Sequence, residues 1–223
     1  MPADLDDLDA LVRRVDPDRW LSSRFITDAQ ARADVVALYA FDHELARAPK
    51  VASNPLIAEI RLTWWREVLD EIHDGKPARA HPAARALAEA VRRRGLAREP
   101  LEAMIDGRIA GLGASGPEIA SAARLAGGSV AVCAAAILGD AALAEAARPA
   151  GELWAEIRSV GDLGQAEIGP RLSLARRAAR RLQPPAFAAV AHVALARSYA
   201  AGGTPSPAWA RVRLVAAVLT GSL

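Results

Sequence analysis

Apolar residues recur at three- and four-residue intervals along the whole chain, which is the period of an amphipathic helix. No alternation of apolar and polar residues continues long enough to indicate a β-strand. Proline and glycine interrupt the pattern and mark the ends of its segments. The pattern predicts an all-α protein with helices over residues 4–15, 28–48, 55–73, 81–94, 99–112, 117–138, 150–166, 171–182, 185–201 and 207–219.

The segment 55–73 illustrates the reasoning. Asn54 is a favoured N-cap residue, and Pro55 is favoured in the first turn of a helix. Gly75 and Pro77 then end the segment. Its apolar residues share one wide face, which predicts a helix packed against a core. They are Ile57, Ile60, Trp64, Trp65, Val68, Leu69 and Ile72.

Length and composition predict a single domain over residues 1–223. The chain has 223 residues, of which 52% are hydrophobic, enough for one well-packed core. Its formal charge is only +2, and its basic residues form no long run of the kind that nucleic-acid binding requires. Aromatic residues make up 4%, too few for a platform on which bases stack. We therefore expect no nucleic-acid partner.

The single cysteine, Cys133, excludes an intrachain disulfide and fits a reducing compartment. It lies in the apolar run 130–138, which predicts a buried, inert thiol. That run is far shorter than the roughly 18 residues that span a bilayer, so we predict no transmembrane helix. The acidic N-terminal segment does not have the pattern of a secretory signal. A cytoplasmic protein is expected.

The segment 39–50 places four residues on one stripe of a predicted helix. Positions 39, 43, 46 and 50 lie above one another because residues three and four apart share a helix face. They are Tyr39, His43, Ala46 and Lys50. Asp42 and His43 are neighbours in the helix, so their side chains diverge and do not predict a catalytic dyad. The remaining histidines, His73, His81 and His192, lack metal-ligand spacing and are expected at the surface or at helix ends.

Several short segments occur in the same order as in the squalene/phytoene synthase family, which the chain resembles over most of its length. The resemblance implies a helical bundle of the isoprenoid synthase type. It also implies prenyl diphosphate substrates held by magnesium ions on two aspartate-rich helices. The segments are 22–25 (SSRF), 39–41 (YAF), 64–69 (WWREVL), 75–77 (GKP), 81–87 (HPAARAL), 105–107 (IDG) and 127–128 (GG).

The chain departs from this family at the residues that bind the metal. On the first stripe the family has two aspartates, where this chain has Ala46 and Lys50. In the second motif Asp162 matches the first carboxylate, whereas Ala166 replaces the second. Magnesium is tethered to substrate phosphates by such carboxylates. We therefore expect no metal or other cofactor, with Asp162 the only retained motif carboxylate.

The resemblance indicates candidate ligand-binding residues but no confident catalytic ones. The serine-rich segment, the stripe, the tryptophan helix and the second motif all contribute to the set. Tyr39 and the tryptophans could equally be plain core residues, and His43 could take the place of a family arginine that meets an anion. The candidates are Ser22, Ser23, Arg24, Phe25, Tyr39, His43, Trp65, Asp162 and Arg171.

Three functional readings follow. The first is a non-catalytic member that binds a protein partner or an isoprenoid lipid, similar to the branch of the family that acts in respiratory complex I assembly and has lost the aspartates. The alternative is a magnesium-dependent prenyltransferase that condenses two prenyl diphosphates head to head. The third is a helical domain without a ligand. The missing carboxylates favour the first reading over the second.

One cluster of arginines could bring the protein to a membrane. Arg176, Arg177, Arg180 and Arg181 lie along the short predicted helix 171–182, beside leucines. Such a helix can rest on anionic lipid head groups, although a solvated face is the simpler interpretation. The cluster predicts a peripheral location on the inner membrane as an addition to the cytoplasmic one.

Overall fold

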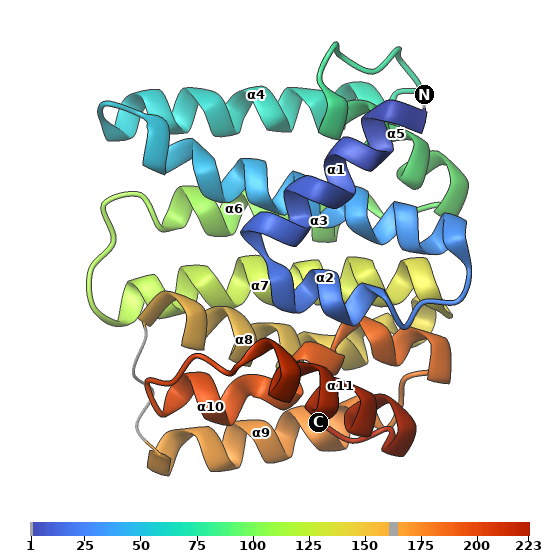
Figure 1. Cartoon of the computed structure of the whole chain (residues 1–223). Coiled ribbons are helices and arrows are strands. Elements are labelled where there is room, and N and C mark those ends of the chain that lie inside the picture. The colour runs from blue at the N-terminus through green and yellow to red at the C-terminus, as the bar shows by residue number, and fades with distance from the viewer. Residues whose placement is uncertain (1, 161–164) are drawn as a thin grey trace.

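The computed structural model describes residues 2–160 and 165–223, and within these ranges the chain is helical without strands, as the sequence predicted (Figure 1). Its elements are α1 (Pro2–Val15), α2 (Pro17–Ser23), α3 (Ala29–Val51), α4 (Pro55–His73), α5 (Pro82–Arg94), α6 (Arg98–Ala110), α7 (Pro117–Leu138), the 3-10 helix η1 (Ala141–Ala147), α8 (Arg148–Val160), α9 (Gln165–Ala179), the 3-10 helices η2 (Pro184–Ala189) and η3 (Ala191–Leu195), α10 (Ala196–Ala200) and α11 (Pro207–Thr220).

Helix ends follow the local sequence signals. The Asn54 side chain accepts a hydrogen bond from the backbone N–H of Ile57 at 3.0 Å, and Pro55 begins α4. Ser206 caps α11 in the same way. Gly95 ends α5 with φ of 61°, a left-handed conformation that glycine adopts without steric cost.

The long helices lie roughly parallel or antiparallel in a stack, with α4 at one edge and α9 at the other (Figure 1). Helix α7 lies in the middle and packs against α6, α8 and α3. Helices α1 and α2 cross the front of this stack over α3. This arrangement puts α3, α6, α7 and α8 around one interior region.

Three glycines allow the central helices to cross closely. A Cβ on Gly127 would lie 2.2 Å from the Cβ of Ala155, and one on Gly151 would lie 2.3 Å from the carbonyl oxygen of Gly127. A Cβ on Gly107 would similarly meet the backbone of Ala126 at 2.7 Å. Since such contacts are sterically forbidden, any side chain there would force α7 away from α8 or α6.

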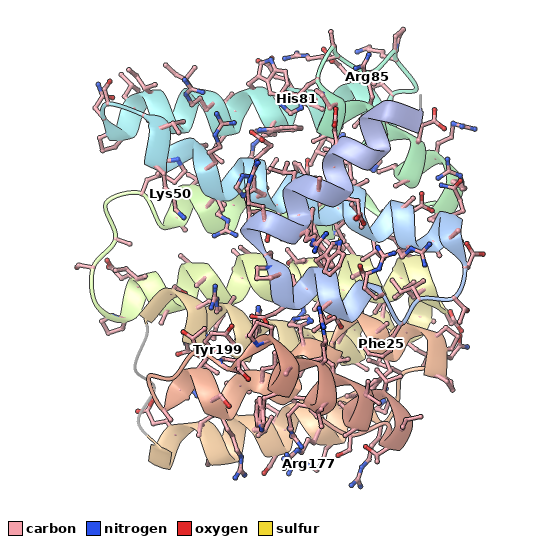
Figure 2. All side chains as sticks on the ribbon, in the orientation of Figure 1. Phe25, Lys50, His81, Arg85, Arg177 and Tyr199 are labelled. Carbon is pink, nitrogen blue, oxygen red and sulfur yellow. The ribbon has the colours of Figure 1, made fainter. Side chains whose placement is uncertain are left out.

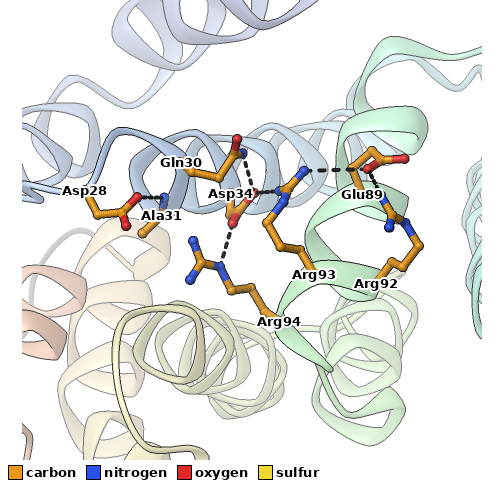
Figure 3. Close-up of polar contacts among 8 residues, drawn as sticks. All are labelled: Asp28, Gln30, Ala31, Asp34, Glu89, Arg92, Arg93 and Arg94. Atoms are coloured by element: carbon orange, nitrogen blue, oxygen red, sulfur yellow. Dashed lines mark hydrogen bonds and ion pairs between the residues drawn. The ribbon is translucent and has the colours of Figure 1, made fainter.

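A buried carboxylate joins α5 to α3 (Figure 3). Asp34 on α3 is only 2% exposed and forms ion pairs with Arg93 and with Arg94, whose Nε lies 2.7 Å from Oδ2. Gln30 donates a further hydrogen bond to the same carboxylate at 3.2 Å. The arginines at the end of α5 therefore hold two helices together.

The predicted apolar face of α4 lies only partly in the core, because Trp65, Val68 and Leu69 are buried whereas Ile60 is 60% exposed. Tyr39, Trp65, Val68 and Ile157 are buried, and Trp65 packs edge-on against Phe41 with ring centroids 5.2 Å apart. Trp64 is only partly buried and contacts the core from its edge. Cys133 is buried, as predicted, and burial raises the pKa of its thiol to about 12.

Three predicted helices differ from the structure, and the observed α2 and η1 were not predicted. The segment 185–201 is not one helix but η2, η3 and α10, because Val190 leaves the helical conformation at φ of −125°. The carbonyl of Ala188 accepts a hydrogen bond from the Ser22 hydroxyl at 2.6 Å, a tertiary contact in place of a helical one. Helix α8 ends at Val160 and α9 begins at Gln165, six residues earlier than predicted.

We expected no segment of membrane-spanning length, but α7 is long enough to span a bilayer. By length and composition it could cross a bilayer, with a mean hydropathy of 1.6 over an 18-residue window. In the fold, 67% of that window is buried, against α6 and α8 among others. Its apolar character is that of the central core helix.

Candidate functional site

A polar cavity of about 210 Å³ lies among α3, α6, α7 and α8, closed on one side by the start of α2. Helix α3 contributes one stripe of its surface to this cavity. The lining residues are Val15, Asp16, Arg19, Tyr39, Asp42, His43, Ala46, Lys50, Arg108, Ala123, Gly127, Trp154, Ala155, Arg158 and Ser159. The structure thus brings together Tyr39 and His43 with the substituted positions Ala46 and Lys50.

A second carboxylate of α3, Asp42, organises the cavity wall. It is 7% exposed and pairs with Arg19 from α2 and Arg108 from α6, each at 2.7 Å. Burial alone would raise the pKa of Asp42, but the two guanidinium groups outweigh it and hold that pKa below its usual range. Asp42 is therefore an ionised structural anchor, with both carboxylate oxygens already paired.

Arg19 extends this network toward the aromatic wall. Its guanidinium lies 5.4 Å from the ring centroid of Tyr39 and 3.5 Å from the carboxylate of Asp16. Burial disfavours its charge, yet Asp16 and Asp42 together raise the pKa of Arg19. The positive charge is consequently held permanently at the inner end of the cavity.

Two buried polar atoms on the cavity wall have no hydrogen-bond partner among the described residues. They are the hydroxyl of Tyr39, whose side chain is 97% buried, and Nε of Arg108. Leaving such a group unpaired costs about 1–3 kcal/mol. Burial also raises the pKa of Tyr39, so its hydroxyl stays protonated and can donate a hydrogen bond. Both atoms are suited to donate to a ligand oxygen.

Positive charge predominates at this cavity. Four permanent cations line it, namely Arg19, Lys50, Arg108 and Arg158, against the two carboxylates Asp16 and Asp42. Lys50 is exposed at the far end of α3, beside α6 (Figure 2). Arg158 stacks over the ring of Tyr199 at 4.8 Å. Because Arg19 and Arg108 already share the carboxylates, Lys50 and Arg158 carry the excess charge of +2.

His43 lies on the same wall and is half-buried. Partial burial is the main cause that lowers the pKa of its imidazole. The ring is therefore neutral near pH 7 and can either donate or accept one hydrogen bond there. It contributes polarity to the cavity without adding charge.

The other predicted site residues lie elsewhere. Ser22 and Ser23 are buried and donate to the backbone carbonyls of Ala188 and Trp20, so their hydroxyls are structural. Phe25 packs partly buried against the core, at the α2 side of the molecule (Figure 2). Trp65 is in the core and does not line the cavity.

Arginines 24 and 171 line other hollows. Arg24 pairs with Asp9 at 3.0 Å in a larger groove of about 640 Å³ between α1 and α3, which contains none of the buried unpaired polar atoms. Arg171 forms an ion pair with the buried Glu156, which also binds Arg124 at 2.9 Å, at a hollow of about 300 Å³. Asp162 lies outside the described residues.

The described residues do not form a magnesium site. Magnesium binds oxygen ligands in near-octahedral geometry. The cavity offers only Asp42 and Asp16, both engaged by arginine, and Lys50 places an ammonium at the position of a family aspartate. Over residues 2–160 and 165–223, no three His, Cys, Asp or Glu side chains are grouped so that they could hold a metal ion.

Sequence reasoning found the α3 stripe but missed Arg19, Asp42, Arg108 and Arg158 as a group. Asp42 and Arg108 are 66 residues apart, and Arg19 is 23 residues from Asp42. No local spacing relates residues on four different helices. Only the apolar surroundings of Asp42, between Phe41 and Leu45, could have indicated a buried carboxylate that needs cationic partners.

The all-α bundle has a counterpart among solved structures. The crystal structure of a dehydrosqualene synthase in complex with ligand matches with a TM-score of 0.73 over 99% of this chain and 96% of that chain. Sequence identity is 14%, so the likeness concerns the fold.

The family model for squalene/phytoene synthase matches residues 12–181, which is more than half of the chain. The protein therefore belongs to the squalene/phytoene synthase family, as the ordered segments predicted. Two similar relatives are NADH dehydrogenase (ubiquinone) complex I, assembly factor 6 of Bos taurus, 34% identical over 98 residues, and its Homo sapiens counterpart, 32% identical. Each match covers 44% of this chain and 29% of the relative's length.

Proposed function

We propose that this protein is a non-catalytic member of its family that binds the anionic group of an isoprenoid lipid or of a protein partner and acts in respiratory complex I assembly. One observation carries the proposal. The α3 stripe that lines the cavity holds Ala46 and Lys50 where metal-dependent chemistry needs carboxylates. A metal ion there would be repelled by the ammonium group rather than held.

The shape and charge of the cavity support binding without turnover. Its volume of about 210 Å³ is below the roughly 300–1,000 Å³ of pockets that enclose drug-sized ligands. Head-to-head condensation requires two prenyl diphosphates together, whereas this space suits a single anionic group. Lys50, Arg158 and the Tyr39 hydroxyl supply the charge and the hydrogen-bond donor that such a group needs.

The named relatives support the cellular role. The two mammalian proteins carry the name of a complex I assembly factor, and their similarity lies within a region of 98 residues. We infer an assembly role for this chain from that similarity and from the loss of the metal-binding residues. It is tested independently of the cavity, in cells.

The absence of synthase turnover is the first test. Purified protein incubated with farnesyl or geranylgeranyl diphosphate and magnesium should release no diphosphate above a control without protein. The reason is that ionisation of an allylic diphosphate needs a bound metal to stabilise the departing charge. Sustained release that Asp162→Ala abolishes would refute the proposal in favour of the prenyltransferase reading.

Direct anion binding is the second test, and the chain offers a matched control because it has only two lysines. Calorimetry with inorganic diphosphate in the presence of EDTA should show binding. Lys50→Gln should weaken it by roughly tenfold, the scale of one charged hydrogen bond. Lys76→Gln, which alters an exposed loop lysine paired with Asp74, should leave it unchanged. Binding that requires magnesium, or that ignores Lys50→Gln, would contradict the proposed site.

A further inference from the structure

The last quarter of the chain is sharply different in charge from the rest. Residues 168–223 contain eight arginines and neither Asp nor Glu, whereas residues 1–167 contain 20 of the 28 basic and all 26 acidic residues. The near-neutral total of +2 therefore conceals a region of +8 beside one of −6. The absence of long basic runs led us to expect basic residues spread evenly along the chain. For residues 168–223 this expectation is wrong.

Several of these arginines are exposed and unpaired. Arg177, Arg180 and Arg181 at the end of α9 are exposed, and none forms an ion pair within the described residues. Figure 2 shows Arg177 at the outer edge of the molecule, beyond α9 and α11. Such charges are held close together only if solvent or an anionic partner compensates their repulsion.

Helix α11 presents an exposed apolar face in the same region. Its buried side, Ala210, Leu214 and Ala217, packs toward η3. On the other side Trp209, Val212, Val215 and Leu219 are 43%, 67%, 42% and 82% exposed. At 100° per residue these four side chains fall within about 120° of the helix circumference. They form one continuous apolar stripe that no element among the described residues covers.

The arginines and the apolar stripe adjoin each other. Nε of Arg176 on α9 donates a hydrogen bond to the backbone oxygen of Leu223, three residues beyond α11, at 2.5 Å. Burial lowers the pKa of Arg176, and the positive charges of the nearby Arg197 and Arg213 lower it further. Arg213 in turn lies 5.9 Å from the ring of Trp209. Basic and apolar groups thus form one surface, which we call the α9–α11 surface.

We propose that the α9–α11 surface docks on an anionic lipid bilayer, with the stripe of α11 inserted at the head-group level and the arginines on the lipid phosphates. A helix with a tryptophan and aliphatic residues on one face, flanked by arginines, has the composition of interfacial helices. A region with no acidic residue over 56 positions is complementary to an anionic leaflet. This surface is distinct from the cavity, and the inference does not rest on the proposed function.

Vesicle sedimentation tests the inference. The protein should bind vesicles of phosphatidylcholine mixed with phosphatidylglycerol, and not vesicles of phosphatidylcholine alone. Binding should weaken as salt screens the charges. Arg177→Ser, Arg180→Ser and Arg181→Ser combined should reduce the partition coefficient by on the order of a hundredfold, since each basic residue near an anionic surface contributes roughly fivefold.

The apolar stripe has its own variant and matched control. Val212→Ser with Leu219→Ser should reduce binding at least tenfold because each removes a buried aliphatic group from the bilayer. Leu56→Ser with Ile60→Ser changes residues that are 66% and 60% exposed on α4, at the opposite edge of the stack, and should change nothing. Circular dichroism melting curves show that each variant is folded.

Four results would overturn the inference. The first is no binding to anionic vesicles at low salt. The second is equal loss of binding in the α11 and α4 variants, which would show that the stripe does not insert. The third is a concentration-dependent dimer that Val212→Ser with Leu219→Ser abolishes, which would assign the stripe to a second copy of the chain. Retention of an RNA or DNA duplex in place of vesicles would likewise contradict it.

Discussion

At the scale of single residues, buried charges in this protein are stabilised by partners distant in sequence. Asp42, Asp34 and Glu156 are each almost fully buried, and each pairs with two arginines. Removing one partner from such a group leaves an uncompensated charge, which costs more than the pair itself contributes. These carboxylates are therefore positions of low tolerance even though only Asp42 lines the cavity.

His192 is the one histidine of the described chain that is buried without any hydrogen bond to its ring. The sequence predicted a surface or helix-end position, yet the residue is 2% exposed in η3 and its ring lies 4.9 Å from Trp154. Burial, with a smaller effect from Arg19, lowers the pKa of His192 well below its usual value. The folded protein thus keeps this imidazole neutral.

This burial predicts a dependence of stability on pH. The pKa of His192 is lower in the folded protein than its value of 6.5 in the unfolded chain. Its contribution to the free energy of unfolding is therefore complete above pH 6.5 and is lost as the pH falls below that value. Between about pH 7 and pH 5 the free energy of unfolding should fall by at most about 2 kcal/mol from this group alone, the value reached when the folded imidazole stays neutral at pH 5. Urea titrations at both pH values measure it.

His192→Phe provides the comparison, because it keeps an aromatic ring beside Trp154 and removes the titrating group. Between pH 7 and pH 5 the free energy of unfolding of His192→Phe should fall by less than that of the wild type. The difference between the two falls should equal the contribution of His192. His43 and His81 also have lowered pKa values, and they contribute equally to both proteins. Identical pH dependence in the two proteins would show that His192 gains a proton in the folded state.

At the scale of elements, the contact between α7 and α8 depends on missing side chains. A Cβ on Gly151 would lie 2.3 Å from the Gly127 carbonyl oxygen and 2.5 Å from the Cβ of Ala131. The first of these neighbours is backbone, so relief requires the helices to separate. Because Gly127, Ala155 and Ser159 line the cavity at this crossing, the spacing of α7 and α8 also sets its width.

Gly151→Ala should therefore destabilise the protein by about 1–3 kcal/mol, the usual cost of overpacking. Gly128→Ala is the matched control, since it lies next to Gly127 on α7 and a Cβ there meets only the side chains of Glu152 and Arg148, the nearest at 2.9 Å. It should cost less than Gly151→Ala, because a side chain can move aside where the backbone cannot. Denaturation midpoints compare the two. Equal effects would mean that α7 and α8 are not in close contact.

At the scale of the whole molecule, charge and fold divide the protein into regions of different chemical character. The cavity lies among α3, α6, α7 and α8, whereas the basic and apolar α9–α11 surface lies at the edge of the stack. A protein that binds an anionic group and a membrane could deliver or hold a component during assembly without performing chemistry on it. Such a role concerns the intact protein in the cell.

A deletion strain tests this role. Native gel electrophoresis should show less assembled complex I, because the proposed function is needed for its assembly. Expression of the wild-type chain should restore the complex, and so should Asp162→Ala if no metal chemistry is involved. Normal complex I combined with loss of terpenoids would reject the assembly role and favour the prenyltransferase alternative.

The sequence by itself determined the features that depend on neighbouring residues. Helical periodicity, the Asn54 cap and the glycine at position 95 predict helices and their ends, because these interactions lie within a few residues. The stripe of Tyr39, His43, Ala46 and Lys50 follows from the same periodicity, and the ordered motifs identified the family. The loss of carboxylates at positions 46 and 50 was visible without any structure.

Only the tertiary structure decided which distant groups meet. It paired Asp42 with Arg19 and Arg108, turned Ser22 toward the carbonyl of Ala188 and divided the predicted helix 185–201 into shorter pieces. It also buried His192 and left one face of α11 uncovered. These outcomes depend on how whole helices pack, and packing energy outweighs the local preference of any single segment.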